Sequence, residues 1–386
     1  MAELGDTALP DIRSAIRDIC AGFGDEYWRE QDKQSRYPSE FVDALTKAGW
    51  LAALIPEEYG GSGLGIAEAS VVLEEVQRQG GNAAACHAQM YVMGTLLKHG
   101  SDEQKRRYLP GIAKGELRMQ AFGVTEPTAG SETTRIRTMA VRDGDEYVVN
   151  GQKIWTSRLK QSDLMLLLAR TTPYDELEDK TRGLSVFVVD LRTAGDRVES
   201  RKIDVMIDHN TYEVWLRDLR IPAADRIGEE GMGFRYILDG WNAERILIAA
   251  ECIGDGRWFI DRATRYARER VVFGRPIGQN QGVQFPLAKA HAAIEAADLM
   301  RWKAARMFDA GKPCGPEANM AKYLASEASW DAANACLDTH GGFGFAAEFD
   351  VERKFRETRL YKVAPINNNL VLAYLAQHVL GLPKSY

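Results

Sequence analysis

The stretch Phe122-Gly-Val-Thr-Glu-Pro-Thr-Ala-Gly-Ser131 decides the fold, together with Asn150-Gly-Gln-Lys-Ile-Trp-Thr-Ser157, which follows it after a short interval. Taken alone, each segment has an ordinary structural explanation. Glu126 to Gly130 reads as a turn rich in proline and glycine, and Asn150-Gly151 reads as a hairpin turn between two strands. Because both segments occur, and in this order, a shared functional role is favoured over two unrelated turns.

The chain on either side of these segments predicts three domains. In residues 1–120 apolar residues recur at helical spacing, as in Ile12 to Ile19 and Phe41 to Ala48, and Ser101 to Gln104 reads as a capping box. Residues 121–232 contain short β-prone runs, with Glu146 to Val149 leading into the Asn150-Gly151 turn. Residues 233–386 return to long helical windows with short connections, which is typical of a helix bundle.

Bulk properties exclude several classes of protein. The 386 residues are 45% hydrophobic, enough for a large core, and the net charge of −6 comes without a basic block, so a nucleic-acid partner is not expected. The five cysteines are scattered and lack metal-ligand spacing, which favours reduced thiols over disulfides or a metal site. The first ten residues do not form a signal peptide, and no stretch approaches about 20 uninterrupted apolar residues. A soluble cytoplasmic protein without a membrane partner is expected.

The two opening segments resemble the flavin-binding core of acyl-CoA dehydrogenases, which carries a T-E-P-x-A-G-S-D run and a K-x-W-I-T-N run. The resemblance covers essentially the whole chain. It implies an α+β fold with an N-terminal α-helical domain, a middle β-barrel or sheet domain and a C-terminal four-helix bundle. It also implies bound FAD.

The resemblance assigns flavin contacts to the middle domain. Thr125 and the backbone of Phe122 to Val124 would bond the pyrimidine edge of the ring, and Trp155 would form an aromatic wall behind it. Ser157 falls where the family has a threonine beside the reactive flavin nitrogen, and Ser131 falls where the family contacts the CoA part of its substrate. Gly130 and Thr156 complete the cofactor-binding residues predicted in this domain.

Two later segments resemble the family's contacts to the flavin dinucleotide, and the first of them, with Gln281, resembles a contact to the cofactor of a neighbouring subunit. In Arg268 to Ile277, Arg270 would pair with the pyrophosphate. The glycines of His340-Gly-Gly-Phe-Gly344 would let the backbone approach the same group. These residues imply a homo-oligomer, a dimer or a tetramer. The residues predicted for this role are Arg270, Phe273, Gln281, Asp338, Gly341 and Gly342, with Asp338 standing where the family usually has glutamine.

The catalytic base is expected on a helix. Many family members carry it in a C-terminal I-Y-E-G-T block, but an ungapped count places Pro365 at that glutamate position. A subset that includes isovaleryl-CoA and long-chain dehydrogenases carries it in an L-x-x-E-R segment, which Trp241-Asn-Ala-Glu244-Arg245 resembles. Glu244 is therefore the predicted base, with Asn242 and Arg245 as substrate-binding residues. The alternative, an ion pair on a solvated face, is disfavoured because Ile246 to Ala250 makes the helix apolar nearly all round.

Pro365 also removes a hydrogen-bond donor. In the family the N–H at this position donates to the thioester carbonyl, and proline has none. Losing such a donor typically costs about a hundredfold to a thousandfold in rate. We expect Ile366 to supply the donor instead, and Asn367 and Asn369 to keep polar flavin contacts where relatives use threonine and glutamine.

The leading functional hypothesis is α,β-dehydrogenation of an acyl-CoA, with electrons passed to an electron-transferring flavoprotein. Pro365 leaves open a relative of different chemistry, such as a desulfinase, an oxidase or a monooxygenase. A non-catalytic flavin-loaded binding protein is a third alternative. The length and branching of the acyl group, and whether it carries a carboxylate, stay open.

Overall fold

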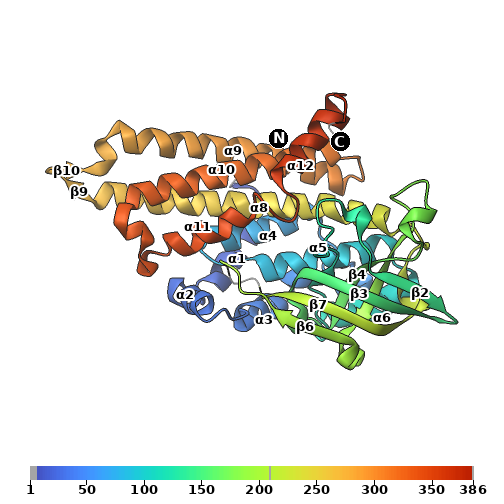
Figure 1. The fold of residues 1–386 in the computed structure, drawn as a ribbon. Helices are drawn as coiled ribbons and strands as arrows, with labels where there is room; N and C mark the ends of the chain where they lie inside the picture. The colour runs from blue at the N-terminus through green and yellow to red at the C-terminus, as the bar shows by residue number, and fades with distance from the viewer. Residues whose placement is uncertain (1–6, 208–209, 385–386) are drawn as a thin grey trace. The chain divides into compact units, whose positions relative to one another are not determined.

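A computed structural model describes residues 7–207 and 210–384 of the chain (Figure 1). These residues form two compact units. One, here called the helical unit, comprises residues 1–34, 65–83 and 242–386; the other, the sheet unit, comprises residues 35–64 and 84–241. The fold combines helices and sheet, with helical, sheet and helical segments in that order along the chain, as the sequence predicts.

The sheet unit is built on one eight-stranded sheet of order β6-β7-β3-β2-β4-β5-β8, with β1 also paired to β4. Most neighbours are antiparallel, whereas β1 and β2 run parallel to β4. The strands are β1 (Ala121–Gly123), β2 (Met139–Asp143), β3 (Glu146–Ser157), β4 (Leu164–Arg170), β5 (Leu184–Asp190), β6 (Val198–Lys202), β7 (Thr211–Pro222) and β8 (Arg226–Ile227).

Strand β4 is buried on both faces of the sheet, between two hydrophobic cores. All seven of its residues are buried, and alternate side chains enter different cores. Leu164 and Leu166 join a core with helical residues, whereas Met165 and Leu167 join a core with β3 and β7 residues. A strand covered on both faces is expected to be continuously apolar, and this is why its sequence shows no alternation.

Four helices belong to the sheet unit: α3 (Ser39–Lys47), α5 (Ala84–His99), α6 (Asp102–Ala113) and the short α7 (Leu191–Ala194). The capping box predicted for α6 is confirmed. Gln104 N donates to Ser101 Oγ at 3.1 Å, and Ser101 N donates to Gln104 Oε1 at 3.0 Å. The predicted helix from Phe41 to Ala48 is also present as α3, and Gly49 follows it in a left-handed conformation.

The helical unit contains long helices that run alongside one another in Figure 1. Helix α8 (Gly233–Glu269) begins in the sheet unit and continues into this one at Asn242. The hairpin of β9 (Val271–Val272) and β10 (Arg275–Pro276) joins α8 to α9. The other helices are α1 (Pro10–Cys20), α2 (Asp25–Lys33), α4 (Ile66–Arg78), α9 (Gln281–Asp309), α10 (Gly315–His340), α11 (Val351–Leu360) and α12 (Asn368–Tyr374).

A buried charge cluster ties four helices of this unit together. The carboxylate of Glu74 on α4 is fully buried and accepts hydrogen bonds from Arg13 on α1 and Arg301 on α9, at 2.9 and 2.8 Å, and from Arg257 on α8. Burial alone would raise the pKa of Glu74, but the charges of Arg301 and Arg257 and the hydrogen bond from Arg13 outweigh it and lower the pKa to about 2. Glu74 is therefore ionised at neutral pH.

One sequence expectation is wrong: Asn150-Gly151 is not a hairpin turn. Strand β3 continues through it to Ser157, with a register shift between Val149 and Gly151. The Asn150 side chain bonds Asp218 on β7 twice at 2.9 Å, which keeps the segment paired. Glycine is required at 151 because a β-carbon there would lie 2.3 Å from Thr138 Oγ1. The actual β2–β3 turn contains Gly144 at φ +61°.

Two further observations concern the whole described chain. All five cysteines are free thiols, as their scattered spacing predicts. None of the helices within residues 7–207 and 210–384 combines the length and apolarity needed to cross a membrane.

Candidate functional site

The structure brings the two opening segments of the sequence analysis together. Ile154 N on β3 donates to Thr125 O at 2.8 Å. The adjacent Lys153 sends its side chain to the same segment, where Nζ donates to Val124 O at 3.0 Å and to Glu126 Oε1 at 2.9 Å. The Thr125 and Trp155 segments are therefore held side by side by backbone and side-chain hydrogen bonds.

Glu126 organises the turn between these segments. Its own backbone pairs with Ala129 through two hydrogen bonds of 3.1 Å, and its carboxylate accepts the N–H groups of Arg137 and Thr138 at 2.6 and 2.9 Å. Lys153 is fully buried, and burial lowers its pKa to about 8, although the charge of Glu126 acts in the opposite direction. Glu126 and Lys153 therefore fix this proline- and glycine-containing turn against β3.

Trp155 has an unusual backbone on this surface. Its φ is +61°, and it lies at the register shift between Lys153 and Thr156. A bulky residue in the left-handed region is strained by about 1–3 kcal/mol. The indole is nonetheless 55% exposed rather than packed in the core. Two residues further on, Ser157 Oγ bonds Thr211 Oγ1 at 3.0 Å, whereas Thr156 is buried.

The residues predicted to contact the flavin dinucleotide gather at one end of the helical unit. Arg270 follows α8, Phe273 lies in the β9–β10 hairpin, and the guanidinium of Arg270 lies 5.7 Å from the ring centre of Phe343 after α10. Gln281 opens α9 and Asp338 is exposed near the end of α10. Within the described chain, a β-carbon at Gly341 or Gly342 would meet no heavy atom within 4 Å, so this backbone is open to approach.

Glu244 and Arg245 lie on α8 in the helical unit and are 5% and 7% exposed. Burial of both is what the apolar character of the helix predicts. Burial lowers the pKa of Arg245, and the charge of Glu244 opposes that shift. Arg245 Nη1 donates to Asn242 Oδ1 at 3.3 Å, so the third predicted residue belongs to the same group.

The loop between α11 and α12 carries Pro365 and the asparagines. Asn367 Oδ1 accepts the Leu370 N–H at 2.9 Å and caps α12, and Asn369 is exposed. The sequence analysis missed Lys322 and Asn368. Lys322 on α10 is fully buried, and its Nζ donates to Ile366 O and Asn368 Oδ1 at 2.7 and 2.6 Å. A lysine within the apolar Ala-rich stretch of α10 was the signal that could have revealed this pair.

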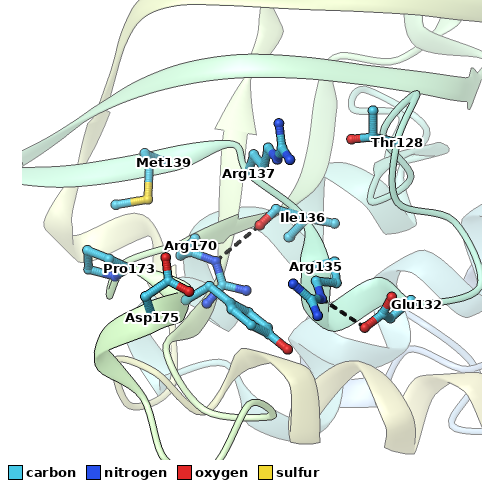
Figure 2. A pocket seen from close by; sticks show the side chains of 10 residues that line it. Thr128, Glu132, Arg135, Ile136, Arg137, Met139, Arg170, Pro173 and Asp175 are labelled. Atoms are coloured by element: carbon cyan, nitrogen blue, oxygen red, sulfur yellow. Dashed lines mark hydrogen bonds and ion pairs between the residues drawn. The ribbon is translucent and has the colours of Figure 1, made fainter. Parts of the chain in front are cut away.

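The sequence analysis also missed a cationic pocket of about 480 Å³ in the sheet unit (Figure 2). Arg135 and Arg170 lie with their guanidinium carbons 4.5 and 5.3 Å from the ring centre of Tyr174. Arg170 is tied to the backbone of Ile136, whereas the Arg137 guanidinium is exposed and has no hydrogen bond or ion pair to any described residue. The lining comprises Thr128, Glu132, Arg135, Ile136, Arg137, Met139, Arg170, Pro173, Tyr174 and Asp175.

The sheet unit thus holds the Thr125 and Trp155 segments together, and the helical unit carries a buried glutamate on its long helix α8. Three family models match the chain: acyl-CoA dehydrogenase N-terminal domain at residues 8–116, middle domain at 121–219 and C-terminal domain at 231–379. The chain belongs to the acyl-CoA dehydrogenase family.

Individual relatives agree with this assignment. Acyl-CoA dehydrogenase fadE12 of Mycobacterium bovis is 38% identical over 97% of this chain and 96% of its own length. The short-chain specific acyl-CoA dehydrogenase of Rattus norvegicus mitochondria is 30% identical over 96% of this chain and 91% of its own. The glutaryl-coenzyme A dehydrogenase–glutaryl-CoA complex superimposes with a TM-score of 0.92 at 30% identity, covering 100% of this chain and 98% of that one.

Proposed function

We propose that the protein is an FAD-dependent acyl-CoA dehydrogenase that converts an acyl-CoA thioester to the 2-enoyl-CoA. The observation that carries the proposal is the buried Glu244 on α8. Many members of the family have their catalytic glutamate near the C-terminus instead, and this chain has Pro365 at that position. Glu244 lies where the family resemblance places the base, on a helix that is apolar over the following residues 246–250. A carboxylate shielded from water at that position is suited to accept the α-proton.

The residues present fit FAD. In the sheet unit, the strained Trp155 offers an exposed indole face, and β3 is fixed against the Thr125 segment beside it. In the helical unit, Arg270 and the open backbone of Gly341 and Gly342 suit a pyrophosphate. When bound, FAD supplies the acceptor for the hydride that leaves the β-carbon.

This chain's own residues would supply the proton transfer and the positioning. The Glu244 carboxylate would take the α-proton, and the electron pair of that C–H bond would form the new C=C bond, with FAD as the acceptor of the hydride from the β-carbon. The acyl group is thereby oxidised by two electrons, which then pass to an electron-transferring flavoprotein. Arg245 and Asn242 would orient the base and the thioester, and Ile366 N–H would donate to the thioester oxygen.

The nucleotide end of CoA would bind at the cationic pocket of the sheet unit. Thr128, one of the residues that line the pocket, is three residues before Ser131 in the sequence. The family resemblance places Ser131 at the CoA part of the substrate. The pocket offers the exposed Arg137 guanidinium for a phosphate and Tyr174 for a base. Figure 2 shows Arg135, already paired with Glu132, on the same rim, whereas Arg170 is engaged with Ile136.

Arg137→Ala is expected to raise the KM for acyl-CoA about fivefold to tenfold, because one charge-assisted phosphate contact of roughly 1–1.4 kcal/mol is lost. The KM for the same acyl group on pantetheine, which lacks the nucleotide, should not change. Steady-state kinetics with both thioesters measure the difference. Arg192→Ala removes another exposed arginine of the sheet unit, paired with Asp190, and serves as the control. Equal effects on both thioesters would contradict the assignment.

We further propose a homo-oligomer, a tetramer or a dimer, that works in the cytoplasm. The dinucleotide residues around Arg270 gather at one end of the helical unit, and Pro365 and Glu244 belong to other parts of it, as expected if different protomers complete each cofactor site. Phe273 is fully exposed there, and Phe285 and Leu299 on α9 are 61% and 58% exposed. Exposed apolar side chains of this size suit a subunit interface. A monomeric particle that retained FAD would contradict this assembly.

Anaerobic flavin absorbance of the purified protein, followed while acyl-CoAs are added, tests the proposed function. Short, branched, long-chain and dicarboxylic acyl-CoAs should be tried in turn, and rapid bleaching by one class is expected. A bound flavin that no acyl-CoA bleaches would overturn the dehydrogenase. Pro365 specifically favours one alternative, a flavoenzyme of variant chemistry, and oxygen uptake or release of an inorganic leaving group would reveal it.

A further inference from the structure

The loop between α11 and α12 is anchored to α10 by a buried lysine. Lys322 Nζ donates to Ile366 O at 2.7 Å and to Asn368 Oδ1 at 2.6 Å. Asn368 continues the contact, because its Nδ2 donates to Ser326 Oγ at 3.1 Å and to Glu327 Oε1 at 2.7 Å. Three residues of α10 therefore hold Ile366 of this loop and Asn368, the first residue of α12.

Ile366 is fixed on one side and open on the other. Its carbonyl is taken by Lys322, whereas its N–H donates no hydrogen bond to any residue that the structure describes. The residue before it, Pro365, has no N–H to offer. Ile366 is only partly buried, so its N–H remains available to a ligand. A donor whose own residue is pinned by a charge-assisted bond is held in place before a ligand arrives.

We propose that Lys322 is a positioning residue: together with Asn368 it holds the Pro365–Asn367 loop so that Ile366 N–H replaces the thioester donor removed by Pro365. The inference rests on the proposed function. Lys322 acts through Ile366 and does not itself touch the substrate. No covalent step is assigned to it.

The charges around Lys322 support a second contribution. Burial lowers the pKa of Lys322 to about 8, so the side chain is mostly protonated at neutral pH. The groups that act on it are Cys252, Arg245 and Glu244 from α8 and Glu327 from α10. The ammonium thus places a positive charge within electrostatic reach of the predicted base. Such a charge favours the ionised carboxylate, which is the form that accepts a proton.

Lys322→Met tests the proposal, because methionine fills similar volume without charge or donor. In the FAD-loaded enzyme we expect the rate of flavin reduction at saturating acyl-CoA to fall at least about tenfold, since a misplaced donor loses part of the hundredfold or more that one donor supplies. The KM should stay within about threefold. The acid limb of the pH–rate profile should move to higher pH by about 0.5–1 unit, because Glu244 loses a neighbouring positive charge.

Lys362→Met is the matched control. Lys362 belongs to the same loop and pairs with Glu327 at 2.7 Å, but its side chain is partly exposed and contacts neither Ile366 nor Asn368 in the described interactions. Its reduction rate and pH profile should match those of the parent. If both lysine variants slow reduction equally and neither moves the acid limb, loop stability alone explains Lys322 and the proposal is wrong.

Exchange of the α-protons separates positioning from hydride transfer. An acyl-CoA analogue with sulfur in place of the β-carbon can lose an α-proton but cannot transfer hydride, and its exchange in D2O can be followed by NMR. We expect exchange to slow in Lys322→Met by the same factor as flavin reduction. Unchanged exchange would overturn the proposal.

Asn368→Ala gives the same test if Lys322→Met does not fold, because it removes the second half of the clamp. Slower reduction and exchange with normal FAD content support the clamp, whereas parental rates overturn it. The proposed function fails differently, since in that case no acyl-CoA bleaches the flavin of the parent enzyme either.

Discussion

Glu244→Gln should retain FAD and lose substrate-driven flavin reduction. Glutamine keeps the size of the side chain, which is 5% exposed on α8, but it cannot accept the α-proton. General-base catalysis typically contributes 10²–10⁴-fold, so the rate constant of flavin reduction should fall by at least about a hundredfold. Anaerobic stopped-flow absorbance at saturating acyl-CoA measures it directly.

The flavin content and the substrate affinity of Glu244→Gln show whether the variant has lost only proton abstraction or has also lost its folded structure. Absorbance after gel filtration should show the parental ratio of FAD to protein, and acyl-CoA should still perturb the flavin spectrum on binding. Asp261→Asn, at an exposed position of the same helix, is the control and should reduce its flavin at the parental rate. Near-parental reduction by Glu244→Gln would eliminate this residue as the base.

Glu74→Gln is expected to have the largest effect on stability. Its carboxylate is fully buried among Arg13, Arg257 and Arg301, from three different helices. Removing one partner from a buried ion cluster leaves uncompensated charge and typically costs 3–5 kcal/mol. The free energy of unfolding, from urea titration followed by tryptophan fluorescence, should fall by about that amount. Glu199→Gln breaks the exposed pair with Arg217, also 2.9 Å long, and should cost less than about 1 kcal/mol.

The pH dependence of this difference has a defined sign. Folding lowers the pKa of Glu74 from its ordinary 4.5 to about 2, so the folded state prefers the carboxylate. The stabilisation is therefore complete above about pH 4.5 and is lost as the pH falls through about 2. The stability gap between the parent and Glu74→Gln should narrow over that window. A gap that did not change down to pH 2 would show that Glu74 is not the ionised centre of the cluster.

The sequence predicted those structural features that depend on residues close together in the chain. The capping box at Ser101, the apolar run of β4 and the order of helical, sheet and helical segments follow from rules that act over a few residues. The prediction of a hairpin turn at Asn150-Gly151 was wrong because it considered only these two adjacent residues. Their turn chemistry is overridden by Asp218 and Thr138, which are distant in sequence and adjacent in space.

The candidate site was predictable only where its residues lie in compact motifs. The Thr125 and Trp155 segments carry their signal in consecutive letters, and the structure joins them through Ile154. Lys322 and Asn368 are 46 residues apart, so the lysine in an alanine-rich helix is a local signal, but its partner is revealed only by the folded chain. The pocket around Arg137 likewise depends on how the loop of Tyr174 folds back on β2, which only tertiary structure reveals.

The left-handed backbone of Trp155 lowers the stability of the ligand-free protein, but it presents an exposed indole that a ligand could contact. A conformation that disfavours a bulky side chain by about 1–3 kcal/mol spends a sizeable part of the 5–15 kcal/mol that keeps a typical protein folded. Glycine would relieve the strain at once, yet it would remove the indole. The left-handed backbone at Trp155 therefore lowers the stability of the protein and keeps an aromatic side chain exposed on the sheet unit.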